Sequence, residues 1–75
     1  MDIADLLIHV QPTLSAEQRA KIEAALSESK GVVSAHFSPT HSHLLTVAYD
    51  PEAIHAGQLL QTVREWDAAA AMAGL

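Results

Sequence analysis

The sequence predicts one α+β domain in which two helices cover one face of a four-stranded antiparallel sheet. Three observations predict it: a length of 75 residues, short β-branched runs separated by amphipathic stretches, and the order in which the two alternate. A chain of this length has room for one domain, which we assign to residues 1–75. Apolar residues make up 49% of the chain, a share typical of a compact fold.

The first strand and the first helix are predicted from an apolar run and a capping signal. Residues 6–10 are apolar and rich in β-branched side chains, and Pro12 follows as a stop. Ser15 and Gln18 have the spacing of a capping box, which predicts that the helix begins there. We expect Gly31 to end this helix as its C-terminal cap.

The second half of the chain predicts a hairpin, a helix and a last short element. Residues 32–37 and 44–49 are rich in strand formers, and the Ser, Thr, Pro and His residues of 38–43 are typical of a hairpin loop. A short amphipathic helix is predicted over 59–66. In 68–75 the alanines favour helix, but the position after the second helix favours a fourth strand, which we prefer.

The resulting order, strand-helix-strand-strand-helix-strand, is the split βαβ arrangement of ferredoxin-like sandwiches. In this arrangement one parity along the strands faces the helices and forms the core. Trp66 is expected to pack against the core beside the first loop. The predicted core residues are Ile8, Val10, Ile22, Leu26, Ala35, Phe37, Leu45, Val47, Tyr49, Leu60 and Val63.

The other parity predicts an open sheet face that no helix covers. Such a half-apolar face can bind a partner, and an exposed edge strand favours association. Antiparallel sheets are also commonly solvated on one side, so both interpretations stay open. The open face comprises Leu7, His9, Ser34, His36, Leu44, Thr46 and Ala48, of which Leu7, His9, His36, Leu44 and Thr46 are the candidate interaction residues.

Composition excludes several classes of function. The chain has no cysteine, which excludes a disulfide, a thiolate metal cage and a thiol nucleophile. The net charge is −5 and the four basic residues form no stripe, so we expect no nucleic-acid partner. No apolar run approaches the roughly 20 residues of a membrane helix, and the acidic start differs from a secretory signal. We therefore expect a cytoplasmic protein that does not enter membranes.

Two further functions are disfavoured by where their residues lie. A serine nucleophile needs a base and an orienting carboxylate, and Glu17, the carboxylate near Ser15, is a first-turn helix residue. An RNA-recognition module stacks bases on aromatic residues of the open face, whereas Phe37 and Tyr49 have core parity. We therefore expect neither catalysis nor RNA binding.

Several short patterns along the chain resemble one known family. They are Ile8-x-Val10, Ile22-x-x-Ala25-Leu26, Gly31-Val32, Val47-x-Tyr49-Asp50-Pro51 and Leu59-x-x-x-Val63. With them the chain resembles the heavy-metal-associated domains, which include copper chaperones and the N-terminal modules of metal-pumping ATPases. The resemblance covers nearly the whole chain and implies the same ferredoxin-like fold in a metal-homeostasis context.

The motif that binds metal in this family is missing. Family members carry Gly-Met-x-Cys-x-x-Cys after the first strand, and without a gap that stretch falls on residues 12–18, Pro-Thr-Leu-Ser-Ala-Glu-Gln. Ser15 and Gln18 thus occupy the cysteine positions. Neither side chain can replace a thiolate as a soft ligand for monovalent copper, so the family's metal chemistry is not expected to carry over.

Five histidines offer a different ligand, because neutral imidazole binds zinc, copper and nickel. His41 and His43 are the candidate metal ligands, since the predicted topology brings the hairpin loop near the family's metal loop. His9 is expected one strand away, His36 on the edge strand and His55 at the opposite end. Two ligands alone make a weak site, so solvated hairpin histidines remain the plainer interpretation.

The sequence predicts a non-enzymatic domain with no cofactor that acts by binding a protein partner or a second copy of itself. The alternative is a histidine-based site for divalent zinc, nickel or copper, with His41 and His43 completed by a neighbouring residue or a second chain. A third possibility, an ACT-like domain that senses a small molecule at a dimer interface, shares the predicted topology.

Overall fold

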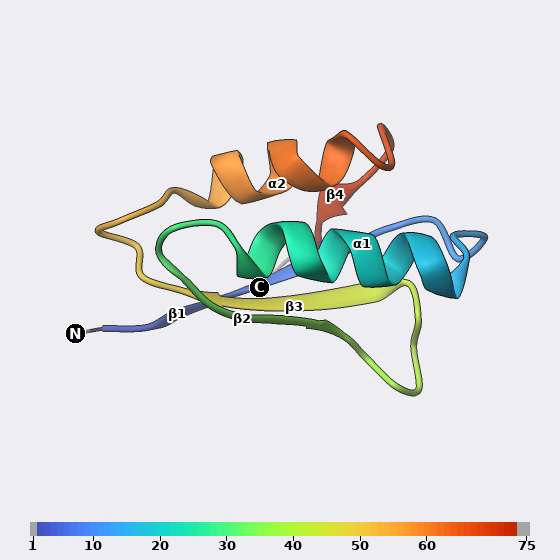
Figure 1. Ribbon diagram of the computed structural model, residues 1–75, viewed down its shortest axis with the longest axis horizontal. Helices are drawn as coiled ribbons and strands as arrows, with labels where there is room; N and C mark the ends of the chain where they lie inside the picture. Colours follow the sequence, from blue (N-terminus) through green and yellow to red (C-terminus); the bar gives the residue numbers. More distant parts are fainter. Residues whose placement is uncertain (1, 74–75) are drawn as a thin grey trace.

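The computed structural model describes residues 2–73 and has the predicted sandwich architecture (Figure 1). Its sheet order is β2-β3-β1-β4 with antiparallel neighbours, and both helices lie on the same face of the sheet. This confirms the predicted fold class. The elements are β1 (Ala4–His9), α1 (Ala16–Ser27), β2 (Val32–Phe37), β3 (Leu44–Tyr49), α2 (Ala56–Arg64) and β4 (Ala71–Met72).

The first three strands follow the sequence pattern closely. β2 and β3 have the predicted bounds, because each is a short β-rich run between turn residues. β1 begins earlier than residue 6 and ends before Val10. The early start has a cause outside the strand itself, since Ala4 pairs with Tyr49 at the end of β3. Pairing register rather than local hydropathy therefore sets the start of β1.

The fourth strand is present but short. Ala71 pairs with His9 and Met72 pairs with Ile8, which confirms that the tail forms a strand. Gly74 and Leu75, the last residues of the predicted segment, lie outside the described residues.

Helix α1 begins with the predicted capping box. The Ser15 Oγ accepts the Gln18 N–H at 3.1 Å, and the Ser15 N–H donates to the Gln18 Oε1 at 2.9 Å. The prediction that Gly31 caps the other end is wrong, because Glu28 is the C-cap residue. Gly31 instead turns the chain into β2 with a φ of 96°, a conformation that glycine adopts readily.

Helix α2 begins before the predicted residue 59, at Ala56. His55 precedes it, and its N–H donates to the Gln58 Oε1 at 2.9 Å, which satisfies a backbone donor at the helix start. The earlier start and the end at Arg64 leave Trp66 outside the helix. Trp66 is 41% exposed, so the prediction that it packs against the core is wrong.

The core lies between the helices and one face of the sheet. Leu59 and Val63, four residues apart on one stripe of α2, are fully buried, whereas the predicted Leu60 lies beside this stripe and is only partly buried. Phe37, at the end of β2, is also only partly buried. The buried apolar residues are Leu6, Ile8, Val10, Ile22, Leu26, Ala35, Leu45, Val47, Tyr49, Leu59, Val63 and Ala70.

No helix within residues 2–73 has the length and apolar character needed to span a membrane.

Candidate functional site at the histidine end of the sheet

Three histidines meet where β1 ends and the β2–β3 hairpin turns, and we call His9, His41 and His43 the histidine cluster. The ring centroids of His9 and His43 are 5.1 Å apart, and those of His41 and His43 are 5.9 Å apart. The Val10 N–H donates to the His43 carbonyl oxygen at 2.9 Å, which fixes the hairpin to β1. The cluster therefore joins a strand end to a loop distant in sequence.

Hydrogen bonds within the hairpin hold its histidines in place. The Ser38 Oγ accepts the N–H groups of Thr40 at 3.3 Å and His41 at 3.2 Å. The Leu44 N–H donates to the His41 carbonyl oxygen at 2.9 Å and closes a turn. The His41 Nδ1 lies 3.0 Å from the Thr40 Oγ1, so one ring nitrogen already has a partner. Serine and threonine side chains thus build the loop that carries two of the imidazoles.

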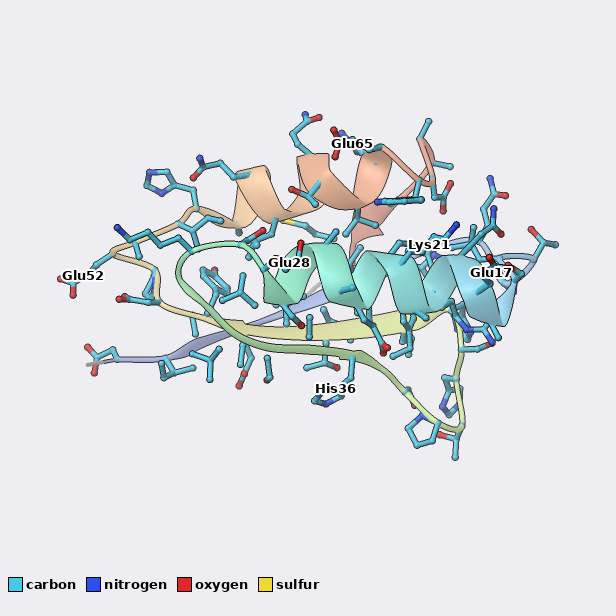
Figure 2. All side chains as sticks on the ribbon, in the orientation of Figure 1. Glu17, Lys21, Glu28, His36, Glu52 and Glu65 are labelled. Atoms are coloured by element: carbon cyan, nitrogen blue, oxygen red, sulfur yellow. The ribbon has the colours of Figure 1, made fainter. Side chains whose placement is uncertain are left out.

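The other two histidines lie elsewhere. Figure 2 shows His36 projecting from β2 on the side of the sheet away from the helices, and this side chain is exposed. His55 lies between β3 and α2, beyond the end of β3 that is distant from the hairpin. The structure therefore brings His9 to the candidate ligands His41 and His43 and leaves His36 and His55 apart from them.

The first loop, at the same end of the molecule, is tied down by Asp67. This carboxylate is only 6% exposed, and its Oδ2 accepts the Gln11 N–H at 2.8 Å. Its Oδ1 accepts the Ala69 N–H at 3.0 Å. Asp67 thus fixes the segment between β1 and α1 to the segment between α2 and β4. Asp67 was not among the predicted site residues, because a single acid between Trp66 and a run of alanines gives no sequence signal of this role.

The open face forms cross-strand rows. His36 pairs with Thr46 and Thr46 with Leu7, so these three residues form one row across β2, β3 and β1. In the next row His9 pairs with Leu44, beside the histidine cluster. Leu7, Leu44 and Thr46 are half-buried although no helix lies over them. The five candidate interaction residues therefore form one continuous surface.

The described residues set limits on what this end can bind in its present arrangement. Within residues 2–73, no three His, Cys, Asp or Glu side chains are placed together so as to hold a metal ion. The same part of the chain contains no pocket. Any ligand of this region therefore has to bind at the surface, and a metal ion requires a side chain to move.

Comparisons with known proteins support the fold. No family model matches the sequence, and no similarity to a curated protein was found. Among solved structures, the chain is similar to a CopZ metallochaperone, with 17% identity over 93% of this chain and 100% of that one and a TM-score of 0.75. It is also similar to a copper binding domain from HMA7, a P-type ATPase, with 18% identity over 93% of each chain and a TM-score of 0.79.

A third solved structure gives the same result. Oxidized MerP from Ralstonia metallidurans CH34 is 12% identical over 97% of this chain and 100% of that one, with a TM-score of 0.80. At these identities the likeness shows a shared fold. The chain contains no cysteine, in agreement with the missing motif.

Proposed function

We propose that this chain is a non-enzymatic contact domain, that its contact surface is the open face, and that a second copy of the chain binds there. The observation that carries the proposal is the continuous row of His36, Thr46 and Leu7, which crosses three strands with no helix above it. Half-buried apolar groups on such a face lose further contact with water when a partner covers them.

The distribution of charge favours contact through this face. With histidines counted as neutral, the residues of the open face carry no formal charge, and Asp5 adds one acid at the far end of β1. Figure 2 shows Glu17, Glu28 and Glu65 on the helical layer together with Lys21, whose Nζ lies 3.7 Å from the Glu17 Oε1. A face with few charges adds little local repulsion when two copies with a net charge of −5 each meet through it.

The edge of the sheet is a poorer contact surface than the face. Because the Ser38 N–H donates inward to the Leu44 carbonyl oxygen, the preceding Phe37 N–H points outward from β2. The Glu23 Oε2, from α1, accepts this N–H at 2.7 Å. A register shift between Val32 and Ser34 also distorts the other end of the strand. Both features protect an edge against pairing with another strand.

Sedimentation equilibrium over a range of protein concentrations tests the proposal. We expect concentration-dependent dimers, with amide chemical shifts changing on dilution at Leu7, His36 and Thr46. Thr46→Glu places a charge in the middle of the row and should weaken association by about tenfold or more, since desolvating an unpaired charge is costly.

Gln61→Glu is the matched control, because it adds the same charge at an exposed position of α2. A monomer at every concentration contradicts the proposal, as does equal weakening by both variants.

A metal-homeostasis context is also part of this proposal. It rests on the resemblance in sequence and on the likeness in fold to a metallochaperone and a copper binding domain. Co-purification of the chain with a metal transporter or a metal-responsive protein from its own cells would support this context, and partners unrelated to metals would contradict it.

A further inference from the structure

We propose that the histidine cluster is a surface site for one divalent transition-metal ion, with His9, His43 and His41 as ligands. This inference does not depend on self-association through the open face. It rests on the contact between His9 and His43, which brings a strand residue to the two hairpin imidazoles.

The ring spacing fits a shared ion. Two imidazoles that bind one tetrahedral metal through nitrogens at about 2.0–2.1 Å have their ring centroids roughly 5 Å apart. The centroids of His9 and His43 are 5.1 Å apart, with an angle of 71° between the ring planes. This pair therefore already has the spacing of two ligands of one ion.

The backbone holds these two ligands in a fixed relation. His9 is the last residue of β1 and pairs with Leu44, the first residue of β3. His43 directly precedes Leu44, and its carbonyl oxygen accepts the Val10 N–H at 2.9 Å. Ligands placed by paired strands lose little freedom when an ion binds, which favours affinity.

His41 is the ligand that has to move. Its centroid is 5.9 Å from that of His43, and in the present arrangement the three rings do not converge on one point. The His41 side chain is exposed, so rotation meets no packed neighbour. When the His41 Nδ1–H donates to the Thr40 Oγ1, the Nε2 carries the lone pair that a metal needs.

The donor set selects the class of metal. Three neutral imidazole nitrogens suit Cu²⁺, Ni²⁺ and Zn²⁺, whereas Mg²⁺ and Ca²⁺ prefer oxygen ligands. With three protein ligands, a fourth position remains for water. We expect Cu²⁺ to bind most tightly, as the general order of affinities for nitrogen sites predicts.

Isothermal titration calorimetry of the full chain with Cu²⁺, Ni²⁺, Zn²⁺ and Mg²⁺ at neutral pH tests the site. We expect one transition-metal ion per chain and no response to Mg²⁺. His9→Gln and His43→Gln should each weaken binding by about 10- to 100-fold. His55→Gln is the matched control and should leave the affinity unchanged, since this histidine precedes α2 and lies away from the cluster.

Amide NMR spectra of each variant establish that it is folded, and in the native chain they should show metal-induced changes at residues 9–11 and 38–44. Three results would overturn the inference: no binding of any transition metal, equal losses of affinity in the His9, His43 and His55 variants, or one ion shared between two chains. Because the association test uses Thr46 and the metal test uses histidines, failure of one proposal is distinguishable from failure of the other.

Discussion

The two faces of this sheet are made by alternate residues of the same strands, yet one is closed and the other is open. Leu45 in β3 is fully buried beneath the helices, whereas its neighbour Leu44 on the opposite face is half-buried. In β1, Ile8 and Leu7 differ in the same way. If the open face binds a second copy as proposed, stability and binding depend on alternate residues of the same strands, so that each can be altered without the other.

The largest expected effect contrasts these two leucines. Leu45→Ala should lower the free energy of unfolding by about 2–5 kcal/mol, because it leaves a cavity in the closed layer. Leu44→Ala removes the same atoms from the open face and should cost less than about 1 kcal/mol. Urea denaturation measures both values. Equal losses of unfolding free energy in the two variants would show that both faces of the sheet contribute alike to stability.

A second variant tests the hydrogen bonds by which Asp67 holds the first loop in place. Asp67→Ala leaves the N–H groups of Gln11 and Ala69 without their acceptor and should cost about 1–3 kcal/mol. Glu65→Ala is the control, because this neighbouring carboxylate is exposed. Denaturation gives the free energies, and amide exchange should accelerate at Gln11 in the Asp67 variant alone. An unchanged exchange rate of the Gln11 amide hydrogen would argue against this role of Asp67.

The smallest expected effect concerns β2, the strand at the edge of the sheet. Glu23→Ala frees the outward Phe37 N–H of β2 and should cost about 1 kcal/mol. Because an unpaired edge promotes pairing with other chains, aggregation measured by light scattering should also rise. Glu28→Ala, which removes an exposed carboxylate from the C-cap of the same helix, should leave aggregation unchanged. Faster aggregation in both variants would point to net charge rather than to the edge.

Local pattern predicted most of the fold because most of its elements carry their own signals. The capping box at Ser15 and the turn residues around β2 and β3 are local, and these elements begin where predicted. Leu59 and Leu60 are adjacent and equally apolar, so only the packed helix decides which of them is buried. Trp66 was expected at the end of the second helix, packed beside the first loop, but α2 ends at Arg64 and leaves it at the surface.

The candidate site was predicted in part. Topology placed the hairpin histidines at the end of the sheet near His9, but the contact between His9 and His43 depends on which individual residues pair. The hydropathy pattern fixes only the face of the sheet on which each residue lies. Asp67 was missed because its role depends on a backbone amide 56 positions away in the chain. What the open face and the histidine cluster bind remains a prediction for the experiments above.

The capping box of α1 also bears on whether a cysteine pair could be introduced into the first loop. In the gapless alignment with heavy-metal-associated domains, Ser15 and Gln18 stand at the two cysteine positions, and each supplies an acceptor to the other. A change to cysteine at either position removes one of these acceptors and costs about 0.5–2 kcal/mol before a second thiol exists to bind copper. The helix cap and a thiolate pair therefore compete for the same two positions, and either single change loses a hydrogen bond without completing a ligand pair.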